Sequence, residues 1–144
     1  LVEMGKYDEA LEYYQKAIKI LTDNRELWYM QGYCLYQSAN YLAAADSFMT
    51  ANAIEYDEDT HLSIAYCYME RKEYPKAVQE FRKMLERGSS NPLIYHELGM
   101  TLLHLEEYDE ACRWLQHFIE NAGAEHAHLL PEAKRCLSEW YWHS

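Results

Sequence analysis

The chain has 144 residues, of which 49% are apolar and 15% aromatic, and 24 Asp and Glu outweigh 13 Lys and Arg to give a formal net charge of −11. This much apolar material excludes a disordered tail, and five Gly and three Pro are too few for a collagen-like or low-complexity segment. The acidic charge argues against a nucleic-acid-binding protein, because such a protein needs a basic face to neutralise phosphates.

Helical patterns follow one another along almost the whole chain. The spacing predicts helices over 8–21, 25–38, 41–54, 58–71, 74–87, 92–105, 108–121 and 128–142, with residues 1–4 as the last turn of an earlier helix. Pro75 and Pro92 fall in predicted first turns, where a missing N–H costs nothing. Gly88 and Gly123 follow predicted helix ends, as C-caps do.

One period of about 34 residues runs through these helices. A tyrosine begins every second helix and recurs with this period: Tyr7, Tyr41, Tyr74 and Tyr108. The helices between them carry a small residue with the same period: Gly32, Ala65, Gly99 and Ala133. A small residue in the middle of a helix contact lets two backbones approach closely. The pattern therefore predicts a series of antiparallel helix pairs.

The best-formed stretches of this pattern resemble the tetratricopeptide repeat, a helical hairpin of about 34 residues. Gly5–Ala17 is similar to the second helix of that repeat, and the next hairpin carries the pattern at Trp28, Gly32, Tyr41, Ala44, Phe48 and Ala51. The resemblance implies an all-α, right-handed α-solenoid of antiparallel helix hairpins with a C-terminal capping helix. It divides a single domain over 1–144 into a partial repeat at about 1–24, repeats at 25–57, 58–91 and 92–125, and a capping helix at 126–144.

The resemblance also implies that the first helix of each hairpin lines a concave groove. The position after each core residue, rotated by about 100° around the helix, is rich in Tyr and Met. We expect this surface to bind a partner: Tyr29, Tyr33, Tyr36, Leu62, Tyr66, Met69, His96, Met100 and His104. Tyr offers a large contact area with little rotamer entropy to lose, and Met adapts to irregular ligands. The alternative is that several of these tyrosines only pack between successive helices.

These features favour a non-enzymatic scaffold that binds a peptide or helix of a partner protein. Acidic residues beside the groove favour a partner with Lys or Arg next to its apolar anchors: Glu26, Asp59, Glu70 and Glu97. The alternative function is a dedicated chaperone of a secreted or membrane-inserting protein, similar to the type III secretion class. The sequence contains no catalytic motif. His96 and His104 lie about 12 Å apart along a helix, so they cannot share a metal ion, and we expect no cofactor or metal.

The cysteines and the apolar runs bear on location. Cys34, Cys67, Cys112 and Cys136 are widely spaced, which is typical of buried thiols in a reducing compartment, so we expect a cytoplasmic protein. No apolar run reaches the length of about 18 residues that a membrane-spanning helix needs, so we expect no membrane partner.

Both ends of the chain suggest self-association. The helix over 8–21 lacks most of its hairpin partner, so we expect either further chain upstream or pairing with another copy. At the other end, Trp140, Tyr141 and Trp142 crowd the last helical turn. We expect at least one of them to pack on the helix over 108–121, near Trp114 or Phe118, and the others to be available for a homodimer.

Overall fold

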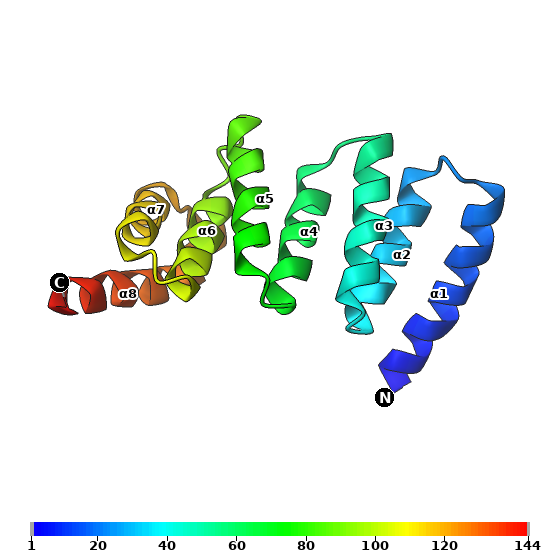
Figure 1. Cartoon of the computed structure of the whole chain (residues 1–144), viewed down its shortest axis with the longest axis horizontal. Coiled ribbons are helices and arrows are strands. Elements are labelled where there is room, and N and C mark those ends of the chain that lie inside the picture. Colours follow the sequence, from blue (N-terminus) through cyan, green and yellow to red (C-terminus); the bar gives the residue numbers. More distant parts are fainter. Residues whose placement is uncertain (1, 144) are drawn as a thin grey trace. The chain divides into compact units, whose positions relative to one another are not determined.

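The computed structural model describes the backbone of residues 2–143 and the side chains of residues 5–140, and every regular element in this part is helical (Figure 1). The helices are α1 (Val2–Ile20), α2 (Arg25–Gln37), α3 (Tyr41–Ile54), α4 (Glu58–Glu70), α5 (Tyr74–Glu86), α6 (Pro92–His104), α7 (Tyr108–Asn121), the 3-10 helix η1 (Ala124–Leu129) and α8 (Leu130–His143). The predicted all-α fold is confirmed. None of the helices in the described part is both long and apolar enough to cross a lipid bilayer.

Two local features differ from the sequence-based expectation. Residues 2–4 are not the end of a separate helix, because they continue into the rest of α1 without a turn. Gly5 is the only residue nearby that disfavours a helix, and one Gly costs a helix only about 1 kcal/mol. The second difference is η1, which connects α7 to α8 and of which only the last two residues fall in the helix expected over 128–142.

The residues that begin and end the helices recur with the same period as the helices. Asn24, Asp57 and Asn91 cap α2, α4 and α6, each accepting a backbone N–H from the first turn through its side-chain oxygen. A second repeated feature is a residue with φ near +60° just beyond α2, α4 and α6: Ala39, Lys72 and Glu106. Single left-handed residues of this kind turn the chain back at helix C-termini. The repeat is therefore visible in the backbone as well as in the side chains.

Helix contacts divide the chain into two units, unit 1 (Leu1–Glu73) and unit 2 (Tyr74–Ser144). In unit 1, α2 packs on α1 and α3, and α3 also packs on α4. The central side chains form one cluster: Leu35, Ala44, Ala45, Phe48, Ile64 and Cys67. Gly32 has the predicted steric role, because a Cβ atom there would lie 2.7 Å from Cδ1 of Phe48. The missing side chain lets the Phe48 ring lie directly against the α2 backbone.

Arg25, the first residue of α2, joins the end of α3 to the start of α4. Its Nε donates to the carbonyl oxygen of Glu55 at 2.7 Å, and its Nη2 donates to Asn52 Oδ1 at 3.1 Å and to Thr60 Oγ1 at 2.6 Å. The carboxylate of Asp57 lies 3.9 Å away. This network holds together the three helices on which the candidate site is built.

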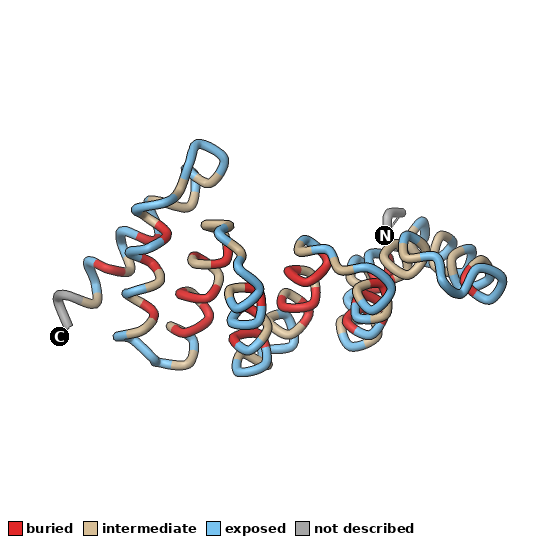
Figure 2. Tube along the Cα trace, turned by 90° about the horizontal axis from the view of Figure 1, so that it is seen from above, coloured by how far each residue is buried: buried red, intermediate tan, exposed pale blue. Residues whose placement is uncertain are grey.

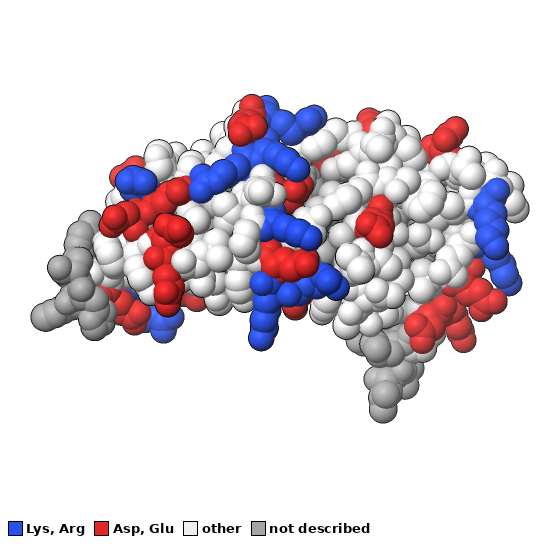
Figure 3. Space-filling view, in the orientation of Figure 1, with Lys and Arg blue, Asp and Glu red and all other residues white. Residues whose placement is uncertain are grey.

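In unit 2, α6 packs on α5 and α7, and α7 also packs on α8. Leu115, Phe118, Ala133 and Leu137 form its core cluster. In each unit the buried positions form stripes along the helices (Figure 2). Basic side chains gather over α5 (Figure 3), where Arg82 lies 2.7 Å from Glu110 and Lys83 lies 3.0 Å from Glu80. Their charges are therefore largely paired within the unit.

The end of α8 packs back on α7 as predicted, but at a different residue. The ring of Trp140 stacks on that of Tyr108, with centroids 5.2 Å apart and an interplanar angle of 17°. We expected this contact near Trp114 or Phe118, which lie further along α7. The side chains of Tyr141 and Trp142 lie outside the described residues.

Candidate partner-binding site

Four of the predicted binding residues meet on unit 1. Tyr29, Tyr33 and Tyr36 of α2 share one helix face because of their spacing of four and three residues. With Tyr66 of α4, they line a pocket of about 200 Å³. Gln37, Phe48 and Ser63 complete this lining. We call this site the tyrosine pocket.

The tyrosines differ in how firmly their rings are held. The ring of Tyr29 lies 5.6 Å from that of the buried Phe48, and the ring of Tyr36 meets that of Tyr41 edge-on at 5.1 Å. Tyr33 is 39% exposed and meets Tyr7 edge-on at 6.0 Å. Edge-to-face pairs of this kind hold aromatic rings in place. The pocket thus has a more buried base at Tyr29 and Tyr36 and a more open side at Tyr33.

Acidic groups surround the tyrosine hydroxyls. Burial raises the pKa of Tyr29, and the carboxylates of Asp57, Asp59 and Glu26 raise it further. Burial also raises the pKa of Tyr36, to about 12, with a smaller contribution from Glu70. Both hydroxyls are protonated at neutral pH, as tyrosine hydroxyls ordinarily are, and can donate hydrogen bonds. The negative potential that these carboxylates create favours a positively charged ligand.

The remaining predicted residues of unit 1 do not line the tyrosine pocket. Leu62 is only 5% exposed, so it presents almost no surface to a partner. Met69 is half-buried. Helical periodicity alone therefore predicted some binding residues, such as Leu62, at positions that neighbouring helices cover.

In unit 2, the predicted residues have structural contacts of their own. His96 is 5% exposed, and its Nδ1 lies 3.1 Å from a carboxylate oxygen of Glu97. Met100 packs against the core cluster of the unit. His104 is exposed, and its ring stacks on that of Tyr74 at 4.5 Å with an interplanar angle of 5°. These three side chains are not gathered into one surface as the tyrosines of unit 1 are.

The described residues offer no metal centre, since no three His, Cys, Asp or Glu side chains among them are placed to hold an ion. All four cysteines carry free thiols. Cys34 and Cys67 are buried, whereas Cys112 and Cys136 are half-buried.

Sequence reasoning missed Phe48 as a member of the site. The position of Phe48 in the repeat predicted only a core residue. Because Gly32 has no side chain, the Phe48 ring lies close to α2, where it contacts the ring of Tyr29. Gln37 and Ser63 were missed as well, because they are polar residues without a repeated pattern. Phe48 and Ser63 reach the pocket only because α3 packs on both α2 and α4.

Models of the tetratricopeptide repeat match two parts of the chain, residues 1–52 and residues 93–120. The chain is also similar to curated proteins. It is 29% identical over 116 residues to anaphase-promoting complex subunit 6 of Arabidopsis thaliana, which covers 77% of this chain and 21% of that protein. It is 23% identical over 108 residues to the BBSome complex member BBS4 of Bos taurus, covering 75% of this chain and 21% of that protein. The chain thus spans about a fifth of the length of these relatives.

Solved structures show the same fold. The crystal structure of MamA matches with a TM-score of 0.75 at 17% identity, covering 93% of this chain and 86% of that chain. The type III secretion chaperone SycD of Yersinia enterocolitica, in complex with a peptide of the translocator YopD, matches with a TM-score of 0.73 at 21% identity. That match covers 79% of this chain and 89% of SycD. The chain therefore belongs to the tetratricopeptide repeat family, whose repeats are protein–protein interaction modules.

Proposed function

We propose that the tyrosine pocket binds a peptide or helix of a partner protein that carries an apolar anchor beside a Lys or Arg. The observation that supports this most directly is the convergence of four tyrosines from α2 and α4 on one pocket. Tyr is enriched among residues that dominate protein interfaces, because its ring buries a large area and its hydroxyl forms hydrogen bonds. The carboxylates that act on Tyr29 and Tyr36 supply the complementary charge for a basic ligand.

Selection of a random-peptide phage library on the immobilised chain tests this proposal. We expect the enriched peptides to carry a large apolar side chain within a few residues of Lys or Arg. A peptide from that selection is then titrated in fluorescence anisotropy against the chain and against the single variants Tyr33→Ala and Tyr66→Ala. Each truncation should weaken binding about 5- to 30-fold, because loss of an interface tyrosine in contact with the ligand costs about 1–2 kcal/mol.

Tyr13→Ala is the matched control. Tyr13 is also a surface tyrosine, 65% exposed on α1, but it does not line the pocket, so its removal should leave affinity within about twofold. Circular dichroism checks that all variants remain helical. If Tyr33→Ala and Tyr66→Ala bind the peptide as well as the unchanged chain does, the tyrosine pocket is not the binding site.

The wider role we propose is that of a non-enzymatic scaffold within a larger assembly. Tetratricopeptide repeat proteins are generally non-catalytic scaffolds. Two of the similar proteins are named as members of complexes, the anaphase-promoting complex and the BBSome, which supports this role. The free thiols of all four cysteines agree with the cytoplasmic location that we propose.

A dedicated chaperone of a secreted or membrane-inserting protein is the second candidate. It is favoured by the likeness to SycD, whose structure contains a peptide of the translocator YopD. A chaperone predicts a client protein that aggregates when expressed alone and stays soluble when it is expressed with this chain. A scaffold instead predicts a partner that folds independently of this chain, so co-expression followed by sedimentation separates the two.

We also propose that the apolar face of α1 supports self-association. Ile20 and Leu21, at the end of α1 and just after it, are 81% and 54% exposed, and adjacent exposed apolar side chains can form an interaction surface. Light scattering across a range of protein concentrations should show a mass that rises toward the dimer. A constant monomer mass would contradict self-association through either end of the chain.

A further inference from the structure

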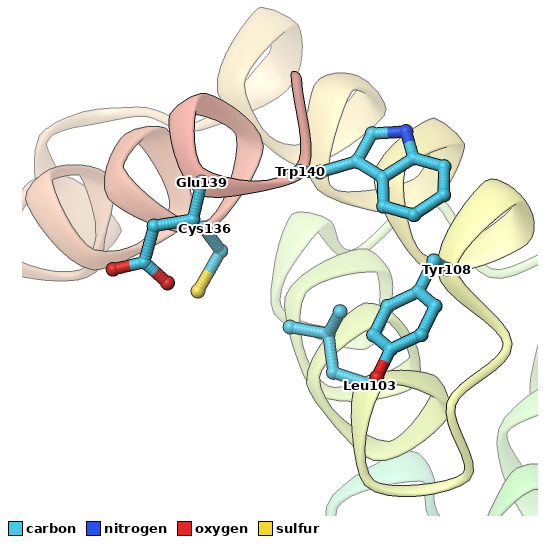
Figure 4. Close-up of a pocket in the computed structure, with 5 residues that line it drawn as sticks. All are labelled: Leu103, Tyr108, Cys136, Glu139 and Trp140. Carbon is cyan, nitrogen blue, oxygen red and sulfur yellow. The ribbon is translucent and has the colours of Figure 1, made fainter. Parts of the chain in front are cut away.

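A second pocket lies in unit 2, and none of the predicted partner-binding residues lines it. It has a volume of about 340 Å³ and lies between α8 and the α6–α7 turn (Figure 4). Its lining comes from three helices and is mostly apolar: Leu103, Tyr108, Cys136, Glu139 and Trp140. That volume is at the lower end of the roughly 300–1,000 Å³ typical of sites that hold small ligands or single anchor side chains.

The repeat explains why this pocket is open. Counted from the small residue of each repeat, three lining positions of unit 2 have equivalents in unit 1: Leu103 corresponds to Tyr36, Tyr108 to Tyr41, and Cys136 to Tyr68. In unit 1 all three equivalents are tyrosines packed against the core cluster. In unit 2 a leucine and a cysteine replace two of those rings, whereas Trp140 stands where unit 1 has Lys72. The same place in the repeat has therefore lost two tyrosine rings, kept one and gained an indole.

We propose that this pocket, which we call the α8 pocket, binds an aromatic side chain of a partner protein that is flanked by Lys or Arg. The partner's ring would occupy space that tyrosine rings fill in the equivalent place of unit 1. Trp140 and Tyr108 stack on each other at 5.2 Å and form the aromatic wall (Figure 4), against which another ring can pack face-on or edge-on. Leu103 and Cys136 supply the apolar part of the lining.

The charge around the α8 pocket selects a basic neighbour for that ring. The side chain of Glu139 is 65% exposed and lies 4.0 Å from Arg135, a weak surface pair that leaves the carboxylate able to meet a partner. Residues 92–144 contain nine Asp and Glu against three Lys and Arg. A Lys or Arg beside the aromatic anchor is therefore attracted, whereas an acidic neighbour is repelled.

The test uses the full 144-residue chain and synthetic peptides as probes. One heptapeptide carries Phe between two lysines in a Gly/Ser background, a second has Ala in place of Phe, and a third has Glu in place of both lysines. Binding is followed by ¹H–¹⁵N NMR through the indole signal of Trp140 and the amides of α6–α8. We expect the first peptide to bind at least about tenfold more tightly than either of the others, with shifts centred on Trp140.

Three variants separate this site from the rest of the molecule. Cys136→Tyr restores the ring found at the equivalent position in unit 1 and should weaken the Lys-Phe-Lys peptide at least about tenfold, whereas Cys136→Ser should stay within about threefold. Tyr33→Ala, in the tyrosine pocket, should leave the titration of the Trp140 signal unchanged even if it reduces shifts on α2 and α4, so failure of one proposal is distinguishable from failure of the other.

Glu139→Lys keeps the test decisive if Cys136→Tyr does not fold, because it alters only an exposed side chain. It should weaken the Lys-Phe-Lys peptide and strengthen the Glu-Phe-Glu peptide. The proposal is wrong if the Ala peptide moves the Trp140 signal at the same concentrations as the Phe peptide, or if the Phe peptide shifts signals of α2 and α4 but none of α6–α8. It is also wrong if raising the protein concentration alone moves the Trp140 signal, since the occupant is then a second copy of the chain.

Discussion

Replacing Gly32 by Ala is the sharpest test of the packing that builds the tyrosine pocket. The added Cβ would lie 2.7 Å from Cδ1 and 2.8 Å from Cε1 of Phe48, whose side chain is only 2% exposed. Carbon atoms in proteins pack best at about 3.5–4.0 Å, so either the ring or α2 has to move. Because Phe48 is surrounded by the core cluster, neither movement is free of cost.

The magnitude follows from two opposing terms. Ala is a better helix former than Gly and would stabilise an open helical position by about 0.5–1 kcal/mol. Overpacking a close-packed core costs about 1–3 kcal/mol. Phe48 is a stiff ring rather than a flexible chain end, so the cost should lie in the upper half of that range. We therefore expect Gly32→Ala to lower the free energy of unfolding by about 1–2 kcal/mol, the difference between the overpacking cost and the gain in helix propensity.

Urea unfolding followed by far-UV circular dichroism measures this change. With a slope of about 2 kcal/mol per molar urea, the middle of the usual range, the midpoint should fall by about 0.5–1 M. Gly5→Ala is the matched control, because Gly5 lies in α1 with no atom within 4 Å of the added Cβ, and this variant should be slightly more stable. If Gly32→Ala raises the midpoint as Gly5→Ala does, the close approach of Phe48 to α2 is wrong.

Three further results are expected. Arg25→Ala should lower the free energy of unfolding by about 2 kcal/mol in the same assay, because it removes three charged hydrogen bonds. Arg135→Ala breaks only an exposed ion pair and should change the free energy of unfolding by less than about 0.5 kcal/mol. Equal effects of the two substitutions would contradict the role of Arg25 in joining α2, α3 and α4. An aromatic disulfide reagent at pH 8 should modify half-buried Cys112 at least about tenfold faster than Cys67. Cys67 has no exposed surface, and burial raises the pKa of its thiol to about 12. Equal rates in the folded chain would contradict that burial. Folding raises the pKa of Tyr36 from 10.0 to about 12, so the contribution of its protonated hydroxyl to stability is fully present below pH 10 and is lost as the pH rises to 12. Tyr36→Phe should therefore reduce the fall in the free energy of unfolding between pH 10 and 12. If that fall is unchanged in the variant, Tyr36 is not its source.

The sequence by itself determined the fold and the family. The repeat period sets which positions face a neighbouring helix, and helical spacing is a local property that needs no tertiary information. The same period predicted the role of Gly32, because a column of small residues has a steric cause. It also predicted Tyr29, Tyr33, Tyr36 and Tyr66 as a group, and the structure brings those four together in one pocket.

Only the tertiary structure decided which residues remain accessible. Leu62 and His96 occupy the same position relative to the core face of their helices as the tyrosines do, yet both are buried. Exposure depends on which neighbouring helix covers that face. The α8 pocket could not be seen in the sequence either. Leu103 lies on the groove face of its helix and Cys136 in an apolar column of the repeat, and the space between them appears only when α8 packs on α7. Shape of this kind arises from the joint packing of residues far apart in the chain, which no local pattern records.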